Sequence, residues 1–227
     1  MRNPGKPGVS AIPETVLPKP GYNIRKKKKV AGDNNTVWKN RRLTMSYCSW
    51  LNNLEGEKRA LHKAYHDRQY GFPIHDDNEL FCRLMLEINQ AGLSWETILK
   101  KEANFRKAYD NFDIGKVAAY TDTDRERLMA DAGIIRNRLK SNAAIENAKA
   151  ILQLQNEFGS FEAWLNRQHP KSKDEWVTIF KKTFRFTGGE IVNEFLVSIG
   201  ILPGAHDEDC PIYKKIIREK PVWMLAK

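Results

Sequence analysis

Apolar side chains recur at helical spacing in the stretch LFCRLMLEINQAGLSW, residues 80–95. Leu80, Leu84 and Ala91 fall on one face of a predicted helix, and Glu87 falls on the same face. An ionised carboxylate that is buried without a partner costs free energy. The pattern therefore leaves three interpretations of Glu87: an internal partner, a protonated carboxyl group, or a cationic ligand. Only the third gives this residue a function.

The same helical spacing continues through most of the chain after residue 45. Asp76 or Asp77 and Ser94 are suitable N-cap residues, and Gly92 ends the helix before Ser94. No stretch of four to eight residues alternates apolar and polar positions with β-branched enrichment, so we expect no sheet and an all-α class. The predicted helices span about 79–91, 95–109, 117–133, 136–158, 160–168 and 188–200.

The formal charge of +10 is concentrated at the N-terminus. Residues 1–44 contain eleven Lys and Arg side chains against two acidic ones, together with five prolines and the block RKKKK. This composition predicts a disordered basic extension, which is either a nucleic-acid-binding arm, a nuclear-type targeting patch, or the product of a mis-assigned start upstream of Met45. Residues 45–213 form the predicted domain and residues 214–227 a C-terminal tail.

Three further features bound the class of protein. No apolar run approaches the roughly 20 residues that span a bilayer, and no secretory signal precedes the domain. The three cysteines, Cys48, Cys82 and Cys210, are too few and too scattered for a disulfide framework. We therefore expect a soluble cytoplasmic protein whose cysteines act as thiols or metal ligands.

The segment DAGIIRNRLK joins two predicted helices through Gly133. Arg136, Arg138 and Lys140 follow where the second helix begins. A glycine turn at a helix N-terminus can present backbone N–H groups to a phosphate, and nearby cations add attraction. The segment resembles a helix-hairpin-helix DNA-binding element, although plain helix packing with solvated cations gives the same pattern.

Cysteine and histidine side chains at metal-ligand spacing form a second candidate site. His206 and Cys210 lie at i and i+4 in HDEDC, while Cys48 in YCSW and His66 in AYHDRQYG lie upstream. Two cysteines and two histidines are a tetrahedral zinc set. The alternative is a chance proximity of His206 and Cys210 in a solvated acidic loop.

Aromatic residues form a third group near the polar positions of the N-terminal half: Trp50, Tyr65, Tyr70 and Trp95. Most aromatic side chains are core residues. However, aromatic faces beside a buried carboxylate such as Glu87 are what a site for a flipped, positively charged purine needs.

Taken together and in order, these motifs resemble the bacterial 3-methyladenine DNA glycosylase I family. The resemblance covers about residues 46–213 and rests on YCSW, AYHDRQYGFP, LEINQAGLSWETILKK, DAGIIRNRLK, FKKTFRFTG and GILPGAHDEDC. It implies an all-α helix-hairpin-helix glycosylase fold with structural Zn²⁺ that joins the N- and C-terminal segments. The zinc ligands implied by the resemblance are Cys48, His66, His206 and Cys210.

The resemblance also implies an activity and residue roles. Glu87 matches the carboxylate that recognises the base, Tyr65 and Trp95 match the stacking aromatics, and Trp50 matches a further tryptophan of the pocket. The expected function is base-excision repair, in which the enzyme flips and hydrolytically releases an alkylated purine, 3-methyladenine first of all. The expected partner is double-stranded DNA containing alkylated bases. We expect the protein to bind it as a monomer and to have no membrane partner.

Several positions depart from the family pattern. Tyr70 stands where the family has Trp, Asn89 stands where it has Gln, and residues 187–190 read Thr-Gly-Gly-Glu in place of Val-Gly-x-Thr. Glu190 adds a second carboxylate, which we expect close to the pocket, so the departures leave the exact lesion open.

The chain also lacks any Asp between Asp131 and Asp174, the region where other helix-hairpin-helix glycosylases carry a catalytic one. This absence fits a monofunctional enzyme for labile cationic lesions. Two alternatives remain: a protein that binds modified DNA without cleaving it, and a zinc-tied helical domain whose partner is another protein.

Overall fold

The computed structural model describes residues 45–225, and within that range the chain is helical without strands, which confirms the predicted all-α class. The expected basic extension, residues 1–44, lies outside the described residues. Eleven α-helices and two 3-10 helices follow one another: α1 (Tyr47–Asn52), α2 (Gly56–Arg68), α3 (Asp77–Gln90), α4 (Trp95–Ala108), η1 (Asp110–Phe112), α5 (Ile114–Ala118), α6 (Asp122–Ala130), α7 (Arg138–Phe158), α8 (Phe161–Gln168), α9 (Lys173–Thr183), α10 (Gly189–Ser198), α11 (Pro211–Arg218) and η2 (Val222–Met224).

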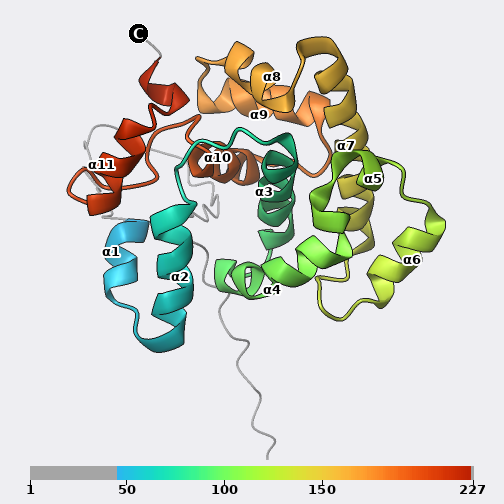
Figure 1. The fold of residues 1–227 in the computed structure, drawn as a ribbon, viewed down its shortest axis with the longest axis horizontal. Coiled ribbons are helices and arrows are strands. Elements are labelled where there is room, and N and C mark those ends of the chain that lie inside the picture. The colour runs from blue at the N-terminus through green and yellow to red at the C-terminus, as the bar shows by residue number, and fades with distance from the viewer. Residues whose placement is uncertain (1–44, 226–227) are drawn as a thin grey trace, which may run out of the picture.

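Helix α3 lies at the centre of the molecule, and other helices surround it (Figure 1). It packs against α4, α5, α7, α8 and α10. All side chains from Leu80 to Gln90 are buried, including the polar ones. A helix that is covered all round cannot send a charged side chain to bulk water, so the polar residues of α3 must find their partners inside the protein.

Helix α7 holds both ends of α3, and the two helices run antiparallel. At the start of α3, the Asp77 carboxylate accepts hydrogen bonds from Gln155 Nε2 at 2.7 Å and from the Phe161 backbone N–H at 2.8 Å. Through the second of these bonds, Asp77 also caps α8. At the other end, Lys140 from the first turn of α7 donates to the carbonyl oxygens of Asn89 and Ala91. These contacts fix the position of Glu87 along the helix axis.

The predicted caps and two of the predicted helix boundaries can be compared directly with the structure. Asp76 caps α3 and Ser94 caps α4, each through a side chain that accepts a hydrogen bond from a backbone N–H three residues on. The segment predicted as one helix over 117–133 is divided, because Thr121 starts a new helix with a capping box to Asp124.

Four helices were not singled out by the hydrophobic pattern, α1, α2, α9 and α11, and the predicted helix 117–133 met α5 only at its last two residues. Two of them carry a local signal nonetheless. Ser172 and Glu175 form a capping box at the start of α9, and Pro211 occupies the first turn of α11. The expected boundary between the domain and its tail at residue 213 falls inside α11, whose Ile216 is buried.

Candidate functional site

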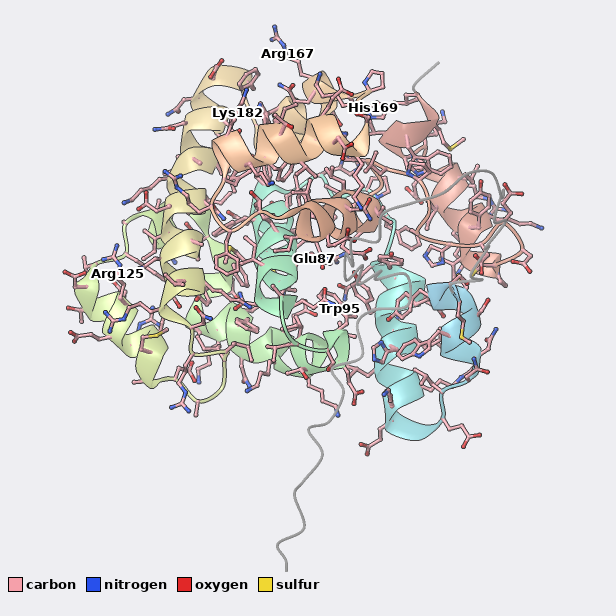
Figure 2. All side chains as sticks on the ribbon, turned by 180° about the vertical axis from the view of Figure 1, so that it is seen from behind. Glu87, Trp95, Arg125, Arg167, His169 and Lys182 are labelled. Carbon is pink, nitrogen blue, oxygen red and sulfur yellow. The ribbon has the colours of Figure 1, made fainter. Side chains whose placement is uncertain are left out.

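Glu87 lies on α3 near the middle of the molecule, where Figure 2 shows it close to the labelled Trp95 at the start of α4. Only 1% of its surface is exposed. Arg83 lies one turn earlier on the same helix and is also buried. The Arg83 guanidinium donates to Tyr65 Oη at 3.3 Å and to Gln69 Oε1 at 3.0 Å, and it lies over the Tyr65 ring at 5.0 Å.

Four aromatic side chains form a cluster next to Glu87, here called the aromatic cluster: Tyr47, Tyr65, Tyr70 and Trp95. Tyr65 is its hub, with ring centroids 5.0 Å from Trp95, 5.6 Å from Tyr70 and 6.2 Å from Tyr47. All four are almost fully buried. The structure thus brings together Tyr65, Trp95 and Glu87, which the sequence placed in one site.

The phenol groups of this cluster stay neutral at physiological pH. Burial raises the pKa of Tyr65 and of Tyr70 well above the usual value, and the negative charge of Glu87 raises both further. The pKa of Tyr47 is raised by burial, by Tyr65 and by Glu87 in turn. Neutral phenols carry no charge, so the cluster surrounds the carboxylate with ring faces and uncharged hydroxyls.

Tyr65 and Trp95 form a corner rather than a slot. Their ring planes enclose 59° and their centroids are 5.0 Å apart, which leaves no room for a planar base between them. A base at this site would contact the face of one ring and the edge of the other. The expected roles of Tyr65 and Trp95 as stacking aromatics stay predictions, and the geometry allows full stacking on one of the two rings at a time.

Trp50 occupies a neighbouring position outside the centre of the cluster. Its ring is stacked on Tyr47 at 5.7 Å, meets His62 edge-on at 4.8 Å, and carries Lys58 Nζ over it at 5.8 Å. Its contact with the cluster therefore passes through Tyr47. Tyr47 Oη in turn bonds to His62 Nδ1 at 2.8 Å.

The second carboxylate near the cluster is not the expected one. Glu190, in the first turn of α10, forms an ion pair with Lys173 at 3.2 Å, and its side chain is 40% exposed. Glu194, one turn further along α10, is half-buried, and its charge contributes to the raised pKa of both Tyr65 and Tyr70. Both residues lie on one face of α10, and Glu190 at its start pairs with Lys173, while Glu194 one turn further along is the carboxylate whose charge acts on Tyr65 and Tyr70.

The four predicted metal ligands converge on one point, and together they are called the metal cluster: Cys48, His66, His206 and Cys210. Their ligand atoms all lie within 4.8 Å of one another. The four distances between a cysteine sulfur and a histidine nitrogen are 3.3, 3.5, 3.6 and 3.9 Å. A tetrahedral zinc ion, with Zn–S about 2.3 Å and Zn–N about 2.0–2.1 Å, separates its ligand atoms by about 3.4–3.8 Å. The donor set and its spacing fit such an ion.

The second nitrogen of each imidazole in the metal cluster has its own partner. His66 Nδ1 lies 2.7 Å from Asp67 Oδ1, and His206 Nε2 lies 2.8 Å from the carbonyl oxygen of Tyr70. An imidazole N–H that bonds outward leaves the other nitrogen as a lone pair aimed inward, which is the usual arrangement around a bound metal. Burial also lowers the pKa of His206 to about 4, which favours the neutral, ligating form.

The predicted DNA-binding hairpin connects α6 to α7, and its backbone N–H groups are largely used inside the protein. The Gly133 N–H donates to Asp131 Oδ1 at 2.7 Å. Asn137 Oδ1 accepts from the backbone N–H groups of Leu139 and Lys140 at 3.0 and 3.1 Å. The exposed groups of the hairpin are instead the side chains at its end, Arg136, Arg138 and Leu139.

Lys140 does not face solvent, contrary to the sequence-based expectation. It is 4% exposed, and its ammonium group donates to the carbonyl oxygens of Asn89 at 3.0 Å and Ala91 at 2.8 Å. Those carbonyls belong to the last turn of α3, where the helix dipole favours a cation. Lys140 therefore holds the turn between α3 and α4 in place, just before Trp95.

Sequence reasoning missed three residues of the site: Tyr47, Arg83 and Glu194. Two of them carried a usable signal. Tyr47 directly precedes the metal ligand Cys48, and Arg83 lies four residues before Glu87 and therefore on the same helix face. Glu194 lies four residues after Glu190 and on the same helix face, but which of the two lies nearer the cluster depends on how α10 packs against α3.

The class of protein follows from these features: a helical domain that buries a carboxylate among aromatic rings and carries a Cys₂His₂ cluster and a basic hairpin. The family model of methyladenine glycosylases matches residues 55–179. The chain belongs to this family of 3-methyladenine DNA glycosylases.

Known relatives cover most of the domain. The DNA-3-methyladenine glycosylase 1 of Escherichia coli (strain K12) is 36% identical over 177 residues, which are 70% of this chain and 92% of that protein. The DNA-3-methyladenine glycosylase of Haemophilus influenzae is 33% identical over 72% of this chain and 96% of its own length. A crystal structure of a Tyr-to-Phe variant of 3-methyladenine DNA glycosylase I (TAG) in complex with 3-methyladenine superposes with a TM-score of 0.62 at 31% identity, covering 67% of this chain and 91% of that one.

Proposed function

We propose that this chain is a monofunctional DNA N-glycosylase of base-excision repair that flips out an alkylated purine and hydrolyses its glycosidic bond, with 3-methyladenine as the first substrate. Its relatives are named DNA-3-methyladenine glycosylases, and the residues that the reaction needs are present. The single observation that carries the proposal is Glu87, a carboxylate with 1% exposure that lies among neutral phenols and Trp95.

The lesion itself explains why a carboxylate and aromatic rings suffice. Alkylation at a ring nitrogen makes the purine cationic, so the base leaves as a neutral molecule. Water attacks C1′ of the sugar, the bond to the base breaks with its electron pair on the base, and the water proton passes to solvent. Glu87 favours a cationic base over undamaged adenine, because its buried negative charge attracts a positively charged base and gains no such attraction from a neutral one.

Tyr65 and Trp95 give the base its orientation in this proposal. The corner that their rings form accepts the face and the edge of a purine, and cation–π attraction adds to the preference for a charged base. Trp50 acts through Tyr47, as a supporting side chain at the edge of the site.

DNA binds through the hairpin between α6 and α7. Arg136 and Arg138 are exposed there and supply phosphate contacts, while Gly133 shapes the turn, since a Cβ at this position would approach Asp131 Oδ1 to 2.9 Å. Lys140 positions the adjacent end of α3 and does not touch DNA.

The metal cluster holds structural Zn²⁺. The ion would be bound by Cys48, His66, His206 and Cys210, and it would join α1 and α2 to the loop before α11. A closed set of four protein ligands contributes folding free energy and leaves no open position for chemistry. We expect the protein to act as a monomer in the cytoplasm, where its free cysteines remain reduced.

Release of bases from methylated duplex DNA tests the proposal. Purified protein should liberate 3-methyladenine, identified by mass spectrometry, and should leave abasic sites without strand cleavage. The Glu87→Gln variant, with melting temperature checked in parallel, is the matched control. Tight binding of methylated DNA without any released base would favour the alternative of a non-catalytic modified-DNA-binding protein.

A further inference from the structure

The loop between α9 and α10, residues 184–188, presents an aromatic side chain to solvent. Phe186 is 41% exposed, one of few large apolar side chains on the surface of the described residues. Its φ is +62°, in the left-handed region that bulky residues rarely adopt. Such a conformation persists only when the surrounding structure enforces it.

Buried side chains enforce the conformation of this loop on both sides of Phe186. Asn147 on α7 is fully buried; its Oδ1 accepts from the Arg185 N–H at 2.7 Å, and its Nδ2 donates to the Arg185 carbonyl at 3.2 Å. Thr187 is also buried, and its hydroxyl donates to the carbonyl of Phe180 at 3.1 Å. The protein thus fixes Phe186 in an outward position that its backbone disfavours.

Phe186 lies beside the elements that the proposed function assigns to DNA and to the base. Lys140 Nζ is 5.8 Å from the centre of the Phe186 ring, and the same nitrogen bonds to the Ala91 carbonyl between α3 and α4. The hairpin and the 184–188 loop therefore share Lys140 as a common neighbour. Together they carry these exposed side chains: Arg136, Arg138, Leu139, Arg185 and Phe186.

The charge of this surface matches a polyanion. Residues 133–140 and 184–188 contain no acidic side chain, and three of their arginines are exposed. An apolar side chain held rigidly among cations is the combination that DNA-bending proteins use, since cations bind phosphates while an apolar wedge enters the base stack.

We propose that Phe186 is a DNA wedge, which packs into the base stack next to the flipped nucleotide while Arg185 extends the phosphate contacts of the hairpin. This inference rests on the proposed function and adds a second DNA-contacting segment to it. Its physical basis is that the exposed ring and the turn before Trp95 both contact Lys140, and that exposed arginines lie within a few residues of Lys140 and Phe186 in the sequence.

The test uses Phe186→Gly in the full chain. Glycine adopts a φ of +62° without strain, so the melting temperature should equal or exceed that of the wild type. Affinity for duplex DNA carrying a tetrahydrofuran abasic analogue should fall about tenfold, because one stacked ring is lost. Affinity for free 3-methyladenine should not change.

Two further variants serve as controls for this result. Phe186→Trp should restore DNA affinity, since it keeps a wedge-shaped aromatic group. Met224→Ala removes another exposed apolar side chain, in η2, and should change neither the melting temperature nor DNA affinity.

A Phe186→Gly variant with unchanged DNA affinity would overturn the wedge, and a lower melting temperature together with unchanged affinity would show that Phe186 is a packing residue or serves another partner. Failure of the wild type to release any base would overturn the proposed activity instead, and the DNA-affinity comparison would still decide the role of Phe186.

Discussion

The metal cluster and the aromatic cluster lie side by side but are built on opposite principles. In the metal cluster, four ligand atoms converge on one point, and the outer nitrogens of both imidazoles bond to Asp67 and Tyr70. In the aromatic cluster, ring faces and neutral hydroxyls are spread around the carboxylate of Glu87. The first arrangement suits a small ion that stabilises the fold, and the second suits a flat cationic ligand.

Tyr70 connects the two clusters. Its carbonyl oxygen accepts from His206, while its ring packs edge-on against Tyr47 at 5.4 Å. The next residue, Gly71, donates its N–H to the Ser198 carbonyl of α10 at 2.8 Å and has a φ of +84°. A Cβ there would lie 2.5 Å from Ala205 Cβ, so only glycine allows this approach. Loss of the metal should therefore change the base site by displacing Tyr70, and not by removing a group that takes part in the reaction.

Loss of a metal ligand should give the largest effect. Cys210→Ser should remove the bound zinc and cost several kcal/mol of stability, a fall in melting temperature on the order of 10 °C. Metal analysis and thermal unfolding check this outcome. Asp209→Asn, one residue away on the surface, serves as the control and should retain one zinc per chain. Wild-type protein purified without chelators that contains no zinc would refute the metal assignment.

Removal of the buried ammonium of Lys140 should have the next largest effect. Lys140→Met keeps much of the stem but leaves the carbonyls of Asn89 and Ala91 without their donor, at a cost of about 1–3 kcal/mol. The expected result is a melting temperature lower by a few degrees and slower base release, because the turn before Trp95 loses its anchor. Arg138→Met, at an exposed position of the same hairpin, should leave the melting temperature unchanged. Equal melting temperatures for both variants would contradict the positioning role.

Loss of a hairpin arginine should weaken DNA binding alone. For Arg136→Ala or Arg138→Ala, the slope of log affinity against log salt should decrease by about one unit per residue. Free 3-methyladenine should bind as before, since these two side chains are exposed while the aromatic cluster is buried. An unchanged salt slope in both variants would show that the hairpin does not contact DNA.

Deletion of residues 1–44 should give the smallest effect. The segment has no apolar stripe with which to dock, so melting temperature and base release at low salt should stay close to those of the full chain. If the segment is a DNA-binding arm, its removal flattens the salt dependence of DNA binding; if it reflects a mis-assigned start, the dependence is unchanged. A large drop in melting temperature would contradict both.

The sequence predicted those parts of the site that depend on local spacing. The caps Asp76 and Ser94, the burial of Glu87, and the convergence of Cys48, His66, His206 and Cys210 all follow from short motifs, and the structure contains them. Motif order supplied the identity of the family.

Features that depend on packing between helices were not predictable in this way. Lys140 reads as a surface cation because it follows Arg136 and Arg138, yet its side chain turns inward to the end of α3. Glu190 and Glu194 are equivalent by composition, and only the contact of α10 with α3 decides which of them lies near Tyr65. Positions of this kind depend on how one helix is placed against another, both in rotation and along the helix axis.

Within the described part of the chain, no helix has the length and apolar character that crossing a bilayer requires.

Binding of free 3-methyladenine by Glu87→Gln, with the melting temperature of the same variant, tests the central claim most directly. Hydrogen bonds to a charged group contribute roughly 1.5–3 kcal/mol, so affinity should fall by about one to two powers of ten while the melting temperature stays close to the wild type. Glu190→Gln, which alters only the exposed ion pair with Lys173, should leave the affinity unchanged. A destabilised Glu87→Gln protein with unchanged base affinity would instead mean that Glu87 is a structural carboxylate satisfied inside the core.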